Sequence, residues 1–269
     1  MHYCWRDVMK IKKLSILFSS SIFALFLASH AGAADSLRIG IEAAYPPFAS
    51  KTGNGEIVGF DYDIGNALCA QMQVKCQWVE QEFDGLIPSL KVRKIDAILS
   101  SLTISEERKK SVDFTHRYYQ AAGRIVMKEG ADQGTHFSGL AGKRVGVQRA
   151  GIHDRFATEV LAPIGAQVIR YASLNEAYLD LIAGRLDAVQ GDDVAVQMGF
   201  LDTPNGKGYA FAGEPLRDRK YFGDGVGIAV RKGDKGLAER FNQALAAIRA
   251  NGEYEAIQDY YFKFDIYGE

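Results

Sequence analysis

The sequence predicts an α/β protein made of two similar lobes, each with a sheet flanked by helices. Two observations support this prediction. After residue 34, short β-branched segments alternate with segments of helical period, as in parallel sheets joined by crossover helices. In addition, two segments of the first half recur in the same order in the second half: RIGIEAA and KIDAILSS correspond to RVGVQRA and RLDAVQGD.

The first half alternates strands with helices. Residues 37–43 (LRIGIEA) are typical of a buried strand, and residues 61–72 place their apolar side chains on one helical face. Residues 83–90 (FDGLIPSL) predict a second helix, and residues 94–101 (KIDAILSS) a strand that ends in polar residues. This order is that of one βαβ series.

The second half repeats the pattern and then returns to the first lobe. The predicted strands are 143–149, 166–171 and 185–193, and the predicted helices are 154–161 and 174–183. The glycine-rich segment 221–230 predicts a return strand, after which helices 237–250 and 253–262 would pack on the first lobe. A chain that crosses twice between lobes forms a two-stranded hinge.

The first 34 residues are typical of a secretory signal peptide. A lysine-rich segment precedes an apolar run over residues 14–28, and small residues follow it, so we expect cleavage after Ala33 or Ala34. The run is short for a membrane span, which needs about 20 apolar residues. Met9 begins a cleaner signal than Met1, so the start codon stays open between them.

Charge and cysteine content exclude some functions. Removing the leader takes away four Lys or Arg residues and one Asp, which changes the formal net charge from −1 to −4 and leaves no basic excess for nucleic acid.

Cys69 and Cys76 remain as an even pair in an exported chain, which favours a disulfide, worth roughly 2.5 kcal/mol, over two buried thiols. His116, His136 and His153 lack ligand spacing, and no phosphate-loop or dinucleotide motif is present, so we expect neither metal nor cofactor.

Arg108 is a candidate anchor for a carboxylate. It lies on a predicted turn within residues 100–115 (SSLTISEERKKSVDFT), beside several hydroxyl groups, and a guanidinium matches the two oxygens of a carboxylate. The alternative is a solvated helix start, with Ser105 as the cap and with Glu106, Glu107 and Arg108 facing water.

Polar residues end equivalent strands of the two halves. Glu42 and Gln148 follow one equivalent pair, and Ser101 and Asp192 end another. Ligands of open α/β sheets bind outside the carboxyl ends of the strands. If the two lobes face each other, these four side chains meet across one cleft.

Over nearly its whole length after the leader, the chain resembles the periplasmic binding proteins for polar amino acids, and within them most of all the lysine/arginine/ornithine and arginine/ornithine group. The matching segments are RIGIEAAYPPF, GFDYDIGNALC, FDGLIPSLKVRKIDAILSSLTISEERKKSVDFT, GRLDAV and YFGDGVGIAVRKGD. The resemblance implies the two-lobed type II fold of that family, with two mixed sheets flanked by helices, a two-strand hinge and a single disulfide that corresponds to Cys69–Cys76.

The resemblance also implies the boundaries of the lobes and the partners of the protein. Lobe 1 would consist of residues 35–122 and 224–269, and lobe 2 of residues 123–223, with hinge crossings near 120–124 and 217–225. A monomer in the periplasm would bury one amino acid on closure and deliver it to an ABC permease in the inner membrane.

The family's binding residues for the amino-acid head group carry over to matching positions. Arg108 would bind the α-carboxylate, with help from Thr103 and the backbone of Gly151 and Ile152, and Asp192 would bind the α-ammonium. A zwitterion buried on closure needs one fixed cation and one fixed anion, because an unpaired buried charge is very costly.

The binding residues for the side chain of the amino acid carry over in the same way. Tyr45 and Phe83 would enclose it between two rings, and Glu42, with Ser100 and Ser101, would receive its cationic end. Aromatic faces on either side of a guanidinium add cation–π attraction of about 0.5–2 kcal/mol. The alternatives are ordinary core packing for the two rings and a solvated strand end for Glu42.

The sequence departs from the group at one turn and one strand end. Ala150, Gly151 and Ile152, followed by His153, stand where the group usually has a Gly-Ser-Thr run, so hydroxyl groups are lost and a titratable ring is expected at the cleft rim. Gln148 stands where an apolar residue is common. These changes leave the ligand open and could admit a larger guanidino compound.

We therefore expect a solute-binding protein, not an enzyme, that captures a basic amino acid by hinge closure. Arginine is favoured, followed by ornithine, lysine and histidine. The alternatives are a cyclohexadienyl-type dehydratase on the same fold, with Glu42, Asp192 or His153 as the general acid, a binding protein for an arginine-derived opine, and a sensor for a separate membrane kinase.

Overall fold

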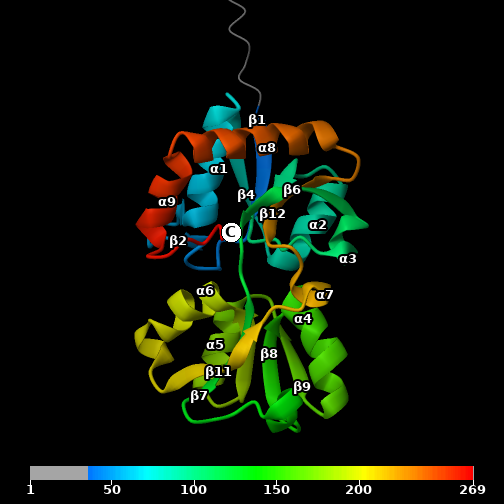
Figure 1. Cartoon of the computed structure of the whole chain (residues 1–269), viewed down its shortest axis with the longest axis vertical. Helices are drawn as coiled ribbons and strands as arrows, with labels where there is room; N and C mark the ends of the chain where they lie inside the picture. The colour runs from blue at the N-terminus through cyan, green and yellow to red at the C-terminus, as the bar shows by residue number, and fades with distance from the viewer. Residues whose placement is uncertain (1–35, 269) are drawn as a thin grey trace, which may run out of the picture. The chain divides into compact units, whose positions relative to one another are not determined.

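The structure, a computed structural model, describes residues 36–268. The predicted signal peptide and its cleavage site lie outside the described residues. Within the described part, two five-stranded sheets form the framework, and a two-stranded sheet joins β2 (Ser50–Lys51) to β3 (Ile57–Val58). Figure 1 shows the large sheets in separate halves, with helices on both sides of each. The predicted α/β fold of two lobes is confirmed.

The sheet of the first lobe contains segments from both ends of the described chain. Its strands are β1 (Ser36–Ile41), β4 (Lys75–Glu80), β5 (Ala97–Ile98), β6 (Val112–Tyr119) and β12 (Val226–Arg231), in the order β4-β1-β5-β12-β6. Here β1 is parallel to β4 and β5, whereas β12 is antiparallel to β5 and β6. The helices are α1 (Phe60–Gln71), α2 (Phe83–Lys91), α3 (Glu106–Lys109), α8 (Lys235–Ala250) and α9 (Glu253–Tyr261).

The sheet of the second lobe is built from one continuous stretch of chain. Its strands are β7 (Gly123–Lys128), β8 (Arg144–Gln148), β9 (Gln167–Tyr171), β10 (Ala188–Asp192) and β11 (Tyr209–Leu216), in the order β11-β7-β10-β8-β9. The helices are α4 (Ile152–Phe156), α5 (Leu174–Ile182), α6 (Asp193–Val196) and α7 (Arg219–Phe222). Short segments of 3₁₀ or π helix span Thr135–Leu140, Ala157–Leu161, Ala162–Ile164, Gln197–Leu201 and Pro204–Gly206.

The two strand orders explain the repeat in the sequence. Read from the outer parallel strand inward, β4-β1-β5 and β9-β8-β10 have the same arrangement, so β1 corresponds to β8 and β5 to β10. These are the pairs whose sequences match. The side chains that follow them therefore lie at equivalent edges, and the two edges face each other.

Apolar side chains on predicted faces fill the core of the first lobe. Ile64 and Leu68 of α1 are fully buried together with Ile39 and Ile41 of β1. A disulfide links Cys69 of α1 to Cys76 of β4, which confirms the predicted pairing and fixes the helix to the edge of the sheet.

The predicted return strand over residues 221–230 is wrong at its start. Tyr221 and Phe222 belong to α7, and β12 begins at Val226. Asp218 caps α7 by accepting a hydrogen bond from the N–H of Lys220, and Gly223 ends the helix with φ 64°, in the left-handed region that glycine adopts freely. The two aromatic rings pack on Phe156 instead of extending a strand.

The chain passes between the sheets from β6 to β7 and returns through α7 to β12. The lobe boundaries stated above remain our proposal. No helix among the described residues is long and apolar enough to cross a bilayer.

Candidate functional site

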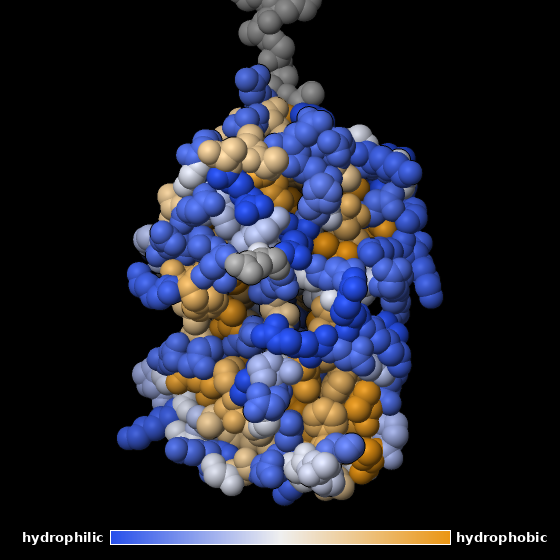
Figure 2. Space-filling view, in the orientation of Figure 1, coloured by the Kyte–Doolittle hydropathy of each residue, from blue (hydrophilic) through white to orange (hydrophobic). Residues whose placement is uncertain are grey.

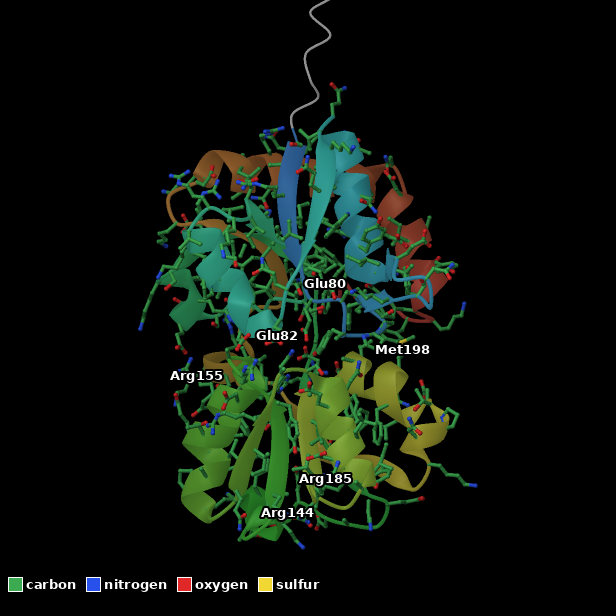
Figure 3. All side chains as sticks on the ribbon, turned by 180° about the vertical axis from the view of Figure 1, so that it is seen from behind. Glu80, Glu82, Arg144, Arg155, Arg185 and Met198 are labelled. Atoms are coloured by element: carbon green, nitrogen blue, oxygen red, sulfur yellow. A yellow bond between two sulfur atoms is a disulfide. The ribbon has the colours of Figure 1, made fainter. Side chains whose placement is uncertain are left out.

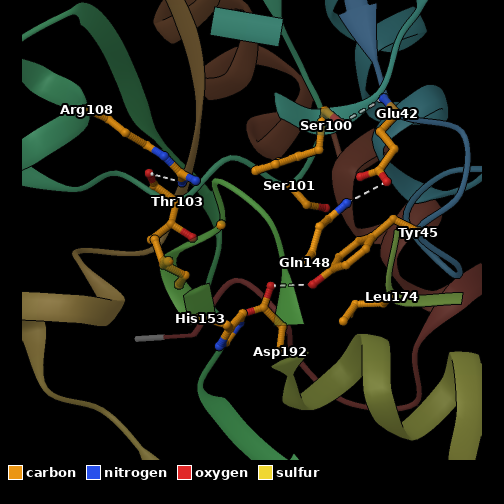
Figure 4. Close-up of a pocket in the computed structure, with 13 residues that line it drawn as sticks. Glu42, Tyr45, Ser100, Ser101, Thr103, Arg108, Gln148, His153, Leu174 and Asp192 are labelled. Atoms are coloured by element: carbon orange, nitrogen blue, oxygen red, sulfur yellow. Dashed lines mark hydrogen bonds and ion pairs between the residues drawn. The ribbon is translucent and has the colours of Figure 1, made fainter. Parts of the chain in front are cut away.

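The structure brings all twelve residues that the sequence predicted for ligand binding to one pocket (Figure 4). They come from loops and element ends of both lobes. Leu174, the first residue of α5, also lines the pocket but was not predicted, because it looks like any apolar helix residue in the sequence. The predicted set is Glu42, Tyr45, Phe83, Ser100, Ser101, Thr103, Arg108, Gln148, Gly151, Ile152, His153 and Asp192.

Arg108 is held in the pocket wall by a short helix rather than a turn. Ser105 caps α3 by accepting a hydrogen bond from the backbone N–H of Arg108, as the solvated-helix alternative predicts. That alternative is wrong for the Arg108 side chain, which is only 9% exposed. Its guanidinium donates to the carbonyl oxygens of Thr103 at 3.0 Å and Ala150 at 3.3 Å, and lies 5.5 Å from the ring centre of Phe83.

The charge of Arg108 lacks a carboxylate partner within the described residues. Its hydrogen-bond acceptors are carbonyl oxygens, and burial lowers its pKa to about 10, although the negative charges of Asp192 and Glu107 act in the opposite direction. A buried cation without a counter-charge is costly, so an anion entering the pocket is stabilised there. The first residue of α4, Ile152, presents an N–H that has no acceptor within its own helix, which adds a neutral donor.

Asp192 provides a fixed negative charge from the other lobe. It ends β10 and accepts hydrogen bonds from the hydroxyl of Tyr45 at 2.7 Å and from Nε2 of His153 at 3.0 Å. Burial acts to raise the pKa of Asp192, but His153, Tyr45 and Arg108 outweigh it and keep the pKa below its usual range. Asp192 is therefore ionised at neutral pH and suits an ammonium group.

Glu42 and Gln148 meet across the lobes, as the equivalence of β1 and β8 predicts. Gln148 Nε2 donates to Glu42 Oε1 at 2.6 Å, and the backbone N–H of Glu42 donates to Ser100 Oγ at 2.9 Å. Burial raises the pKa of Glu42 to about 7, partly offset by the Gln148 hydrogen bond. A cationic group beside Glu42 would lower this pKa again.

Two other carboxylates, those of Asp61 and Asp193, lie outside the pocket lining. Asp61 is fully buried and accepts hydrogen bonds from Ser101 at 2.9 Å and from Tyr118 at 2.7 Å. Asp193 accepts from the backbone N–H groups of Ala122 and Val194. Neither is among the lining residues, so Glu42 is the carboxylate at its end of the pocket.

His153 does not lie at the cleft rim as expected. It is 6% exposed, bound to Asp192, and its ring centre lies 5.7 Å from that of Phe222. The reason is the direction of α4, whose first turn points His153 into the wall between the turn and Asp192. Among the described residues, no group of His, Cys, Asp and Glu side chains could hold a metal ion.

Ion pairs outside the pocket join the two lobes, and the sequence did not predict them. Arg149 lies 2.6 Å from Glu82 and also pairs with Asp84, and Arg155 lies 3.2 Å from Glu107. Figure 3 shows Glu82 and Arg155 near the boundary between the lobes. Polar residues are abundant along this boundary on the face seen in Figure 2. Surface charges of this kind carry no pairing signal in a sequence.

The pKa of Glu42 predicts that binding of a cation depends on pH. Below about pH 7 the free protein carries a proton on Glu42, which a cationic ligand must displace, so arginine affinity should rise about tenfold per pH unit there and level off above it. Calorimetry at pH 5.5 in two buffers of different ionisation heat should detect about one released proton. Glu42→Gln should remove the effect. Affinity that is flat from pH 5.5 to 8 in the wild type would contradict it.

Comparison with known proteins gives the family. The model of the bacterial extracellular solute-binding proteins, family 3, matches residues 37–264. The chain belongs to this family. An L-arginine-binding protein of Pseudomonas aeruginosa is 59% identical over 258 residues, which cover 96% of this chain and 99% of the relative.

Other known proteins are also similar to this chain. The lysine/arginine/ornithine-binding periplasmic protein of Escherichia coli is 44% identical over 96% of this chain and 100% of its own length. An ancestral arginine-binding protein, solved with arginine bound, is 37% identical with a TM-score of 0.78, covering 86% of this chain and 99% of that one. The predicted membership and the two-lobed fold are thus confirmed.

Proposed function

We propose that this family 3 solute-binding protein captures a basic amino acid, arginine in preference, between its closing lobes. The observation that carries the proposal is the placement of three buried ionisable groups: Arg108 in one lobe, Asp192 in the other, and Glu42 on the opposite side of the pocket from Arg108 (Figure 4). An amino acid with a cationic side chain presents the complementary three charges.

The strength of such a site is compatible with a transport role. Hydrogen bonds to charged groups contribute about 1.5–3 kcal/mol each, and a handful of them, less the cost of closure, reach the roughly −8 kcal/mol of micromolar binding. Tyr45 and Phe83 line the pocket and provide apolar contact for the aliphatic part of the ligand.

The proposal extends to the cellular location of the protein and to its transport partner. The relatives named above are binding proteins, and one is named periplasmic, which supports export to the periplasm, delivery to an inner-membrane ABC permease and the absence of enzymatic activity. The dehydratase alternative has less support, because the relatives named above are binding proteins and not enzymes. We further propose that the protein acts as a monomer.

The test is thermal unfolding of the mature protein after its ligand has been stripped. A ligand that binds the folded form alone stabilises it, by about 2.7 kcal/mol at a hundred times its Kd, so arginine should raise the melting temperature by several degrees. Ornithine and lysine should give smaller shifts, and aspartate and leucine none. If arginine leaves the melting temperature unchanged, the proposed function is wrong.

A further inference from the structure

Gln148 joins the two lobes inside the pocket through the nitrogen of its side-chain amide. It is the last residue of β8 and is 6% exposed. Its Nε2 donates to Glu42 Oε1 at 2.6 Å and to the carbonyl oxygen of Ala172 at 3.1 Å, and Figure 4 shows the contact with Glu42. Both partners are acceptors, so the nitrogen must face them; the reverse orientation would place oxygen against oxygen twice.

The oxygen of the same amide has no hydrogen-bond partner among the described residues. Within residues 36–268, Gln148 Oε1 accepts no hydrogen bond. It is not sealed from solvent, whereas both amide atoms of Gln190 are sealed and have no partner. Gln148 lines the pocket beside Glu42. A neutral acceptor, Gln148 Oε1, therefore lies next to the carboxylate of Glu42, one oxygen of which already accepts a hydrogen bond from the protein.

This pair of acceptors suits one kind of cation better than another. A guanidinium spreads its charge over a planar group with five N–H donors and is weakly hydrated, so it can donate to the free oxygen of Glu42 and to Gln148 Oε1 together. An ammonium is a compact, strongly hydrated charge, and it gains most from a carboxylate with both oxygens free. The Gln148 hydrogen bond to Glu42 removes that advantage.

We propose that Gln148 is a specificity-determining residue that favours a guanidinium over an ammonium at the distal end of the ligand. The inference rests on the proposed function and deepens it, since it concerns the choice among basic amino acids. An apolar side chain at this position, which the resemblance leads one to expect, would leave both oxygens of Glu42 to the ligand and supply no second acceptor.

The test is a pair of titrations, arginine and ornithine, on the wild type and on Gln148→Met, which keeps the length of the side chain and removes both polar atoms. Arginine should lose about tenfold or more in affinity, since one hydrogen bond to a charged group is removed. Ornithine should change by less than about threefold, or bind more tightly, because Glu42 regains an oxygen. Gln148→Leu should behave in the same way.

Arg149→Met is the matched control. Arg149 is the next residue and also joins the lobes, through Glu82 and Asp84, but it does not line the pocket. Losing this contact should weaken the binding of arginine and of ornithine by the same factor, because the contact affects only the closure of the lobes. Circular dichroism and thermal unfolding of each variant establish that the protein is folded when titrated.

The outcomes separate the inference from the proposed function. A ratio of arginine to ornithine affinity that falls about tenfold in Gln148→Met, and is unchanged in Arg149→Met, supports the inference. An unchanged ratio in Gln148→Met overturns it while leaving the proposed function intact. A wild type that binds neither ligand overturns both.

Discussion

Replacing Arg108 by methionine is expected to abolish amino-acid binding while the protein stays folded. The guanidinium is the buried cation of the pocket wall, and its hydrogen bonds run to the carbonyl oxygens of Thr103 and Ala150 rather than to a counter-charge. Losing two charge-assisted hydrogen bonds to the ligand carboxylate costs about 3 kcal/mol or more, which is at least about a hundredfold in affinity. Calorimetric titration with arginine measures the loss.

Two controls accompany the Arg108 variant. Arg144→Met removes an arginine that pairs with Asp187 at the far end of the second lobe, and it should leave binding unchanged (Figure 3). Agmatine, which lacks the α-carboxylate, should bind the wild type poorly. An affinity of Arg108→Met within about threefold of the wild type, under 1 kcal/mol, rules out the clamp role.

Glu42→Gln is expected to weaken arginine strongly and citrulline hardly at all. A buried guanidinium left without a carboxylate costs several kcal/mol, whereas the neutral ureido group of citrulline loses little. The affinity for arginine should therefore fall roughly fiftyfold or more, and the affinity for citrulline less than about threefold. The substituted amide still offers an oxygen to Gln148 Nε2, so the contact between the lobes at 2.6 Å can persist. Paired titrations of both ligands on both proteins decide the matter.

The proposed head-group clamp of Arg108 and Asp192 serves as the internal reference for the Glu42 variant. Arg108 and Asp192 are unchanged in it, so citrulline binding shows that the pocket still closes. Equal losses for arginine and citrulline would show that Glu42 does not read the charge of the ligand.

The sequence predicted most of the fold because its signals are local or repeated. The period of residues 61–72 identifies α1, and the matched segments around Glu42 and Gln148 identify equivalent strands. The carboxyl ends of such strands bind ligands in open α/β sheets, which brings their polar ends together. What it did not predict depends on contacts far apart in the chain. The aromatic packing of Tyr221 and Phe222 replaces part of a predicted strand with α7.

The sequence predicted which residues line the pocket better than it predicted the contacts that those residues make. The burial of His153 and its bond to Asp192 depend on the direction of α4, which no periodicity records. Leu174 is indistinguishable in sequence from core residues of α5. The pairing of Arg149 with Glu82 needs the relative position of two lobes, which the sequence alone does not supply.

The position of β12 sets the order in which the two lobes can be completed. All strands of the second sheet lie between residues 123 and 216, whereas β12 (Val226–Arg231) is an interior strand of the first sheet, between β5 and β6. On a nascent chain made from its N-terminus, all strands of the second sheet are synthesised before the last strand of the first sheet. Completing the first sheet therefore needs contacts between residues far apart in sequence, which cost more loop-closure entropy. Glu42 and Arg108 thus stand on the lobe that is finished last.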